Sequence, residues 1–103
     1  MAKEIHNMIK LLKVSSNIEN FDLYEREIFY RAYRRMHTSQ QVVKAVDNGL
    51  ELISRMLKND WDTSMTHCSV EMLVQEINNT FLQKIVLQSI VEHLEYKYFK
   101  NCA

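Results

Sequence analysis

Apolar residues recur along most of the chain at spacings of three and four, which is typical of one face of an α-helix. The clearest case is the segment 42–61, where apolar residues fill about half of the helical circumference and polar residues fill the other half. A stripe of this width touches more than one neighbour. We therefore expect a helix over 39–61 at the centre of a helical bundle.

Four further segments show helical spacing of apolar residues, and we expect helices over 3–14, 20–37, 69–79 and 80–99. The boundaries between them carry residues that favour helix ends. Asn20 or Asp22 can cap the second helix. Thr38–Gln41 and Thr80–Gln83 both have the capping-box pattern. The second box favours a break between 69–79 and 80–99 over one long helix that changes partners.

The composition supports the same fold class. The 103 residues include no proline and one glycine, although tight turns in sheets draw on both. With 47% apolar and 25% charged residues, the chain has an ordinary globular composition. We therefore predict a single domain over 1–103 that is all-α, a compact bundle of four to five antiparallel helices that self-associates.

Gly49 lies in the middle of the apolar face of the 39–61 segment. A glycine inside a helix costs about 1 kcal/mol relative to alanine, so it needs a reason. Close approach by a neighbouring helix is one reason. The alternative is a helix-turn-helix motif, because Ala45, Gly49 and Leu50 have its spacing. The apolar stripe continues past Gly49 without a change of phase, and Arg55 falls where that motif needs an apolar anchor, so we place the motif second.

The last segment, 80–99, is apolar over more than half of its circumference. A terminal helix covered on one side does not need so many apolar residues, which suggests a second packing surface against another protein chain. The alternative is that this helix is central to the bundle. The predicted protein interface takes five residues from this helix and two tyrosines from the second: Leu87, Ile90, Val91, Leu94, Tyr98, Tyr30 and Tyr33.

Arginines interleaved with tyrosines in the 20–37 segment suggest an alternative, a nucleic-acid-binding regulator. The candidate contacts to phosphate are Arg26, Arg31, Arg34 and Arg35, with Lys44 and Lys58. Four acidic residues lie among the four arginines between positions 19 and 35, and the net charge of the chain is zero. These acids would repel phosphate. We therefore favour protein contact over nucleic acid.

Residues for catalysis or metal binding are sparse. The chain lacks a glycine-rich phosphate loop and the motifs G-x-S-x-G and H-E-x-x-H. The possible metal ligands do not have the paired spacing of a structural zinc site: His6, His37, His67, Cys68, His93 and Cys102. His93 lies on the apolar stripe of the last helix, where we expect a hydrogen-bonded core or interface residue. We therefore expect neither an enzyme nor a metal or cofactor site.

No segment resembles a signal peptide or a membrane span. Two cysteines do not make a disulfide framework, so we expect a cytoplasmic protein with reduced thiols. Taken with the apolar helix faces, this predicts a small non-enzymatic regulator or adaptor. It would act by helix-mediated contact with a protein, as a homodimer or with a dedicated partner.

Overall fold

The computed structural model describes residues 2–58, 75, 77 and 79–99. In these residues the chain forms four α-helices, one short 3-10 helix and no strand. The helices are α1 (Ala2–Ser16), η1 (Ile18–Asn20), α2 (Leu23–Met36), α3 (Gln40–Lys58) and α5 (Thr80–Tyr98). The prediction of an all-α bundle is confirmed for this part of the chain. The predicted helix at 69–79 and the loop before it lie almost entirely outside the described residues.

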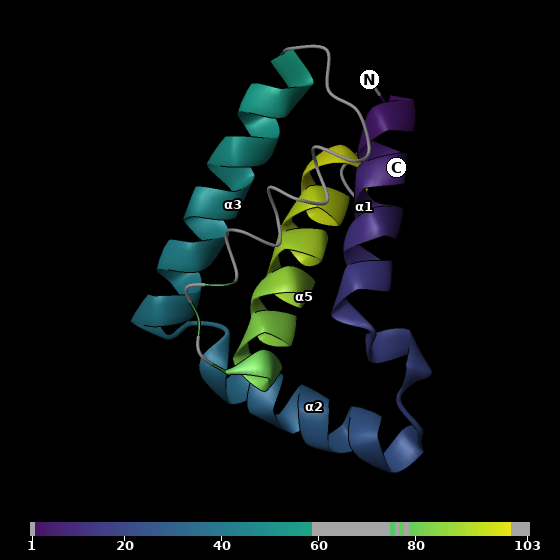
Figure 1. The fold of residues 1–103 in the computed structure, drawn as a ribbon, viewed down its shortest axis with the longest axis vertical. Helices are drawn as coiled ribbons and strands as arrows, with labels where there is room; N and C mark the ends of the chain where they lie inside the picture. Colours follow the sequence, from purple (N-terminus) through teal and green to yellow (C-terminus); the bar gives the residue numbers. More distant parts are fainter. Residues whose placement is uncertain (1, 59–74, 76, 78, 100–103) are drawn as a thin grey trace.

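The centre of the bundle is α5, not the 39–61 helix that the sequence suggested. Figure 1 shows α5 between α1 and α3, and both of these helices pack along it. Side chains on several sides of α5 are consequently buried between positions 82 and 94. The buried residues of α5 are Leu82, Ile85, Val86, Leu87, Ser89, Ile90, Val91 and Leu94. Burial on several sides explains the excess of apolar residues in this segment without a partner chain.

The directions of the helices differ in part from the antiparallel arrangement that we predicted. In Figure 1, α1 runs opposite to α5, whereas α3 and α5 run in the same direction. Sequential helices are antiparallel neighbours when a short loop joins them. Residues 59–79 separate α3 from α5, and a connection of that length allows the two helices to run in the same direction.

The helix ends follow local side-chain chemistry. Asp22 caps α2 in a full capping box: its side chain accepts from the backbone N–H of Glu25 at 2.7 Å, and the Glu25 side chain accepts from that of Asp22. The two boxes predicted for later helices are replaced by neighbouring residues. Ser39, not Thr38, accepts from the start of α3, and Asn79 accepts from two N–H groups of α5. Asn79 is extended, so the predicted break before α5 is confirmed.

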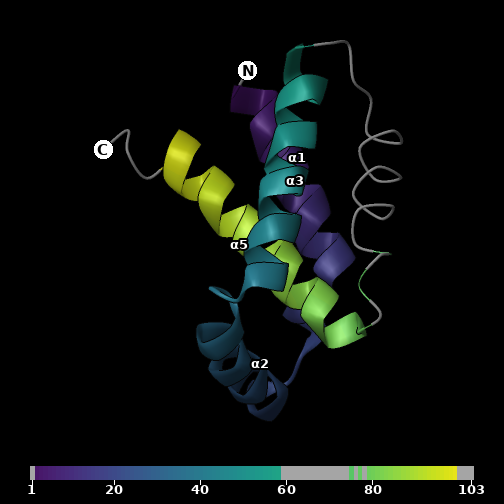
Figure 2. The same ribbon diagram turned by 90° about the vertical axis from the view of Figure 1, so that its left-hand side faces the viewer.

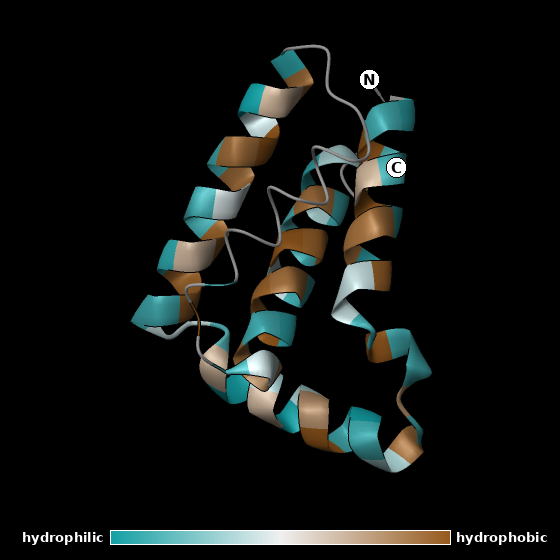
Figure 3. Ribbon diagram, in the orientation of Figure 1, coloured by the Kyte–Doolittle hydropathy of each residue, from teal (hydrophilic) through white to brown (hydrophobic). Residues whose placement is uncertain are grey.

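The core is built from one face of each outer helix against α5. Ile5, Met8 and Leu12 of α1 are fully buried, as are Val42 and Ile53 of α3. Figure 3 shows hydrophobic segments alternating with hydrophilic ones along α1 and α3, as expected for helices with one buried face. The outer helices therefore cover α5 from two sides.

Helix α2 lies across one end of the other three helices, as the two views agree (Figures 1 and 2). It is attached through aromatic side chains on its inner face. Phe29 is fully buried and meets the ring of Phe81 of α5 edge-on, with ring centroids 5.5 Å apart. Tyr33 is also buried and donates a hydrogen bond to Glu92 of α5. The opposite face of α2 consequently points away from the bundle.

Gly49 provides the close approach of helices that the sequence predicted. A Cβ atom at this position would lie 2.7 Å from Cδ1 of Ile90, closer than side chains pack. The helix α3 continues through Gly49 from Gln40 to Lys58. A helix-turn-helix motif that turns at Gly49 is therefore excluded, because no turn occurs there.

The contact between Gly49 and Ile90 can be tested with a double-mutant cycle. We expect Gly49→Ala alone to change the free energy of unfolding by less than about 1 kcal/mol, because the better helix preference of alanine offsets the overlap with Ile90. Ile90→Val removes Cδ1, and the next atom, Cγ1, is at an ordinary 3.5 Å. Alanine should therefore stabilise the Ile90→Val protein by about 1 kcal/mol more than it stabilises the wild type. Urea denaturation of the four proteins measures this difference, and additive effects would contradict the contact.

Candidate functional site

Helix α2 carries the two most exposed large apolar side chains of the described chain, Leu23 and Tyr24. Leu23 is 84% exposed, Tyr24 71% and Ile28 44%. Tyr24 and Ile28 are four residues apart, so they are neighbours on one side of the helix. Arg31 and Arg35 continue the same stripe at the next turns and are also exposed. This stripe, Tyr24–Ile28–Arg31–Arg35, is called the outer face below.

The four arginines predicted as nucleic-acid contacts do not form one patch. Arg31, Arg34 and Arg35 are exposed near the end of α2, and Arg31 pairs with Glu27 at 2.7 Å. Arg26 has a separate role, because its guanidinium donates to the backbone oxygen of Glu19 and ties α2 to η1. An exposed pair at this spacing stabilises a helix by only a few tenths of a kcal/mol, so Arg31 can exchange its partner readily.

The seven residues predicted as a protein interface are placed mostly inside the molecule. Leu87, Ile90, Val91 and Leu94 are buried in the core between α5 and its neighbours, and Tyr98 is half-buried. The argument for self-association from these residues therefore loses its basis, because the chain's own helices cover them. The two tyrosines of α2 differ: Tyr33 is buried, while Tyr30 is 38% exposed at the edge of the helix.

A cavity of about 460 Å³ opens where the end of α2 meets α3 and α5. Its wall combines apolar, aromatic, hydroxyl, imidazole and carboxylate groups. The lining residues are Tyr33 and His37 at the end of α2, Val43, Val46 and Asp47 of α3, and Ser89, Glu92, His93 and Tyr96 of α5. We call it the α2–α3–α5 pocket. Its size is in the range of sites that hold small molecules.

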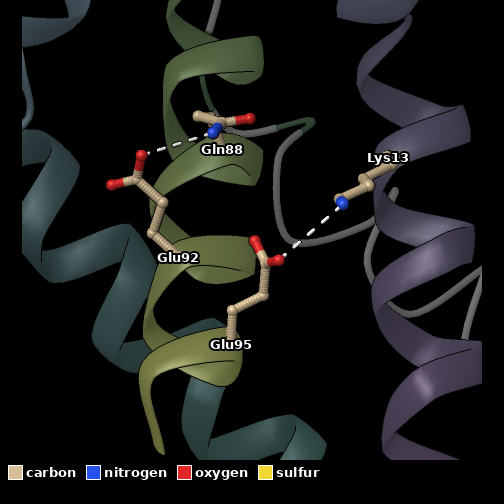
Figure 4. A network of polar contacts seen from close by, with 4 residues as sticks. All are labelled: Lys13, Gln88, Glu92 and Glu95. Carbon is tan, nitrogen blue, oxygen red and sulfur yellow. Dashed lines mark hydrogen bonds and ion pairs between the residues drawn. The ribbon is translucent and has the colours of Figure 1, made fainter. Parts of the chain in front are cut away.

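Both carboxylate oxygens of Glu92 accept hydrogen bonds at this pocket. One of its carboxylate oxygens accepts the hydrogen bond from the Tyr33 hydroxyl, and the other accepts from the side-chain amide of Gln88 at 3.4 Å (Figure 4). Burial raises the pKa of the Tyr33 phenol to about 12, and the hydrogen bond to Glu92 adds to the shift, while the nearby Ser89 hydroxyl opposes it. Tyr33 therefore remains a hydrogen-bond donor to Glu92 at neutral pH.

The two histidines of the pocket are held in the same way. Nδ1 of His37 lies 3.0 Å from the backbone oxygen of Tyr33, and Nδ1 of His93 lies 2.8 Å from that of Ser89. A carbonyl oxygen only accepts, so Nδ1 carries the proton and Nε2 is left as an acceptor in the neutral ring. His37 also stacks on the ring of Tyr33, with centroids 5.1 Å apart. His93 is hydrogen-bonded, as expected, but it is exposed and not in the core, and its ring bonds its own helix at the rim of the pocket.

Ser89 is the one buried side chain in the described residues whose polar atom has no hydrogen-bond partner. It is 4% exposed and lines the α2–α3–α5 pocket. A buried hydroxyl without a partner costs free energy, so most such groups are satisfied by protein, water or ligand. The Ser89 hydroxyl is therefore available to a molecule that enters the pocket.

A second cavity of about 470 Å³ lies between α1 and the end of α5. Lys13 of α1 and Glu95 of α5 line it, and their charged groups are 3.8 Å apart. Figure 4 shows Glu95 reaching toward α1, whereas Glu92 bonds a residue of its own helix. His6 and Phe99 close this cavity edge to face at 5.4 Å. The one carboxylate that lines it in the described residues, Glu95, is paired with Lys13, and Lys10 adds a second positive charge.

Among the described residues, no three His, Cys, Asp or Glu side chains come close enough together to hold a metal ion. Three of the possible ligands named from the sequence, His67, Cys68 and Cys102, lie outside these residues. None of the helices in the described part of the chain is long and apolar enough to cross a membrane.

No protein-family model, curated protein or solved structure matches this chain. The candidate sites therefore rest on the chain's own residues. Sequence reasoning missed Asp47, Ser89, Glu92 and Tyr96 as a group, because they come from two helices whose packing the sequence did not give. The one available signal was Ser89, a hydroxyl placed among the apolar residues of the last helix.

Proposed function

We propose that this chain is a small, non-enzymatic intracellular adaptor or regulator that binds a protein partner through the outer face of α2. The partner contributes an apolar groove with acidic groups at one end. Tyr24 and Ile28 enter the groove, and Arg31 and Arg35 meet the acidic groups. This is the helix-in-groove mode of recognition, in which residues at spacings of three and four are the anchors.

The observation that carries the proposal is the exposure of Tyr24 on a helix that buries Phe29 and Tyr33 against the bundle. A tyrosine that is 71% exposed next to an exposed isoleucine leaves apolar area in water. Aromatic residues and arginine are the types that most often dominate binding energy at protein interfaces. The outer face combines both types on one rigid helix.

The distribution of charge along α2 favours a protein partner over nucleic acid. Glu25 and Glu27 are exposed in the first half of the helix, while Arg31, Arg34 and Arg35 are exposed in the second half. Nucleic acid is uniformly negative, so the acidic half would be repelled along the same groove. A protein partner can instead match both halves of the helix with opposite charges.

A second copy of the chain fits the outer face less well. The 14 residues of α2 span about 21 Å, so one face covers only a few hundred square ångströms. A stable complex needs about 800 Å² from each partner. We therefore propose a different protein that extends beyond α2, and the homodimer becomes an outcome of the test.

The proposal is tested by placing a photo-crosslinking amino acid at position 24 and capturing the bound protein in cells of the native host. Once that partner is purified, we expect Tyr24→Ala combined with Ile28→Ser to weaken binding by a factor of at least about ten, since two anchors are lost. Arg31→Glu with Arg35→Glu should weaken binding and invert its dependence on salt.

Matched controls use exposed residues elsewhere. Val14→Ser removes an aliphatic side chain that is 68% exposed on α1, and Lys58→Glu reverses a charge at the end of α3. Both should leave binding unchanged. A crosslinked product made of two copies of this chain would replace the proposal with a homodimer. Duplex DNA that binds with a steep dependence on salt, and loses binding in the arginine variant, would replace it with the nucleic-acid function.

A further inference from the structure

The α2–α3–α5 pocket has an unusual balance of hydrogen-bonding groups. Two carboxylates, Asp47 and Glu92, line it from two different helices, and no lysine or arginine lines it in the part of the chain that the structure describes. His37 and His93 add two imidazole rings, each bonded to a backbone oxygen through Nδ1, so that Nε2 is the ring nitrogen left for a ligand. The pocket therefore has two carboxylates as its charged acceptors.

The aromatic groups of the pocket add a second preference. Tyr96 is exposed on α5, and the stacked rings of Tyr33 and His37 form the wall contributed by α2. Aromatic faces attract organic cations through the negative charge of the π system. Carboxylates and aromatic faces in one cavity thus favour a ligand that is both positively charged and partly apolar.

Ser89 supplies an independent reason to expect a ligand. Its hydroxyl is almost fully buried, lines the pocket and has no hydrogen-bond partner. A ligand that carries N–H donors can bond this oxygen and remove the cost of leaving it unsatisfied. A purely apolar ligand cannot do so.

The arrangement does not suit a bare metal ion. His37, Asp47, Glu92 and His93 all belong to residue types that bind metals, yet no three such groups are close enough together to share one ion. Acceptor atoms spread around a cavity of about 460 Å³ instead match the separate N–H groups of an ammonium or guanidinium compound, which donate hydrogen bonds. We propose that the α2–α3–α5 pocket binds an organic cation that carries a primary ammonium or guanidinium group.

Each group of the pocket then has a defined role. The ligand's cation lies between Asp47 and Glu92, and Tyr33 holds Glu92 in position by its hydrogen bond. Tyr96 covers the methylene groups of the ligand. Ser89 accepts a hydrogen bond at the base of the pocket. This site is separate from the outer face of α2, so it does not depend on the proposed protein partner.

The probes for the test are agmatine and spermidine, which are free cations, and a lysine blocked at both ends, which represents a side chain of a protein. The uncharged control is an alkyl urea of the same length as agmatine. A urea replaces the guanidinium group, and the amine is acetylated so that no charge remains. Binding is followed by calorimetry and by the NMR signals of the His37, His93 and Tyr96 rings. We expect dissociation constants below about 1 mM for at least one cation and no binding of the urea.

Substitutions in the pocket identify the site. Asp47→Asn and Glu92→Gln each remove one charge and keep a hydrogen-bonding side chain, so each should weaken cation binding by a factor of about ten. Glu51→Gln is the matched control, because it removes one charge from α3 outside the pocket. Ser89→Ala should weaken cation binding, because the ligand loses the buried hydroxyl oxygen that accepts one of its N–H groups.

The outcomes separate cleanly. Tighter binding of the free cations supports the site and assigns it to a small molecule, whereas tighter binding of the blocked lysine supports it and assigns it to a protein side chain. Equal binding of the urea, or cation binding that Glu51→Gln weakens as much as Asp47→Asn does, would overturn the proposal. The absence of binding by every cation at about 10 mM would also overturn it.

Discussion

Replacing Phe29 with alanine is expected to lower the free energy of unfolding by about 3–5 kcal/mol, the usual cost of removing a buried aromatic ring. Phe29 is fully buried, and its ring lies 5.3–6.0 Å from those of Tyr30, Phe81 and Phe21. The contact with Phe81 attaches α2 to α5. The loss is a large part of the 5–15 kcal/mol that stabilises a typical domain. Urea denaturation followed by circular dichroism measures it.

The matched control for this prediction is Tyr24→Ala on the same helix. Tyr24 is 71% exposed, so its loss should change the free energy of unfolding by less than about 0.5 kcal/mol. The pair therefore separates the inner face of α2, which holds the fold, from the outer face, which we propose to bind a partner. Equal effects of the two substitutions would show that α2 is not anchored through Phe29.

The periodicity of apolar residues was sufficient to predict the helices, because each outer helix has one buried face. Helix α3 shows this well: Val42, Val46 and Ile53 were expected on its apolar face, and all three are buried. The predicted helix ends differ from the observed ones by up to three residues, the largest difference being at the start of α2. Ser39 and Asn79 took the capping positions expected for Thr38 and Thr80, since adjacent polar residues can accept from the same N–H groups.

The centre of the bundle could not be found from the same pattern. A helix buried on several sides has apolar residues all around, which weakens the periodic signal that marks a helix with one buried face. The sequence of α5 therefore resembled a helix with a spare apolar surface. Ile85 and Leu87 are two residues apart and therefore lie on nearly opposite sides of α5, yet both are buried by the chain itself.

The candidate pocket was beyond sequence reasoning for a related reason. Asp47 and Glu92 each look like ordinary solvated charges when their own helices are read alone. Their shared cavity depends on how α3 and α5 pack, and Gly49 sets that packing by allowing Ile90 to come close. Sequence alone gave Gly49 its packing role. It gave no means of finding which polar residues would be brought together beside it.

The buried phenol of Tyr33 should make stability depend on pH at the alkaline end of the scale. Burial and the hydrogen bond to Glu92 raise its pKa from 10.0 to about 12 in the folded protein. The neutral phenol is favoured by folding, so the stabilisation is complete below pH 10 and is lost as the pH rises toward 12. The loss should be about 2 kcal/mol, less than the full linkage value because water reaches the phenol through the pocket.

Tyr33→Phe removes the titrating group but keeps the ring. Urea denaturation of both proteins between these pH values should therefore show a steeper decline for the wild type, and groups common to both cancel in the difference. Parallel curves would mean that the phenol titrates alike in the folded and unfolded chains, and that the hydrogen bond to Glu92 does not hold the proton on Tyr33.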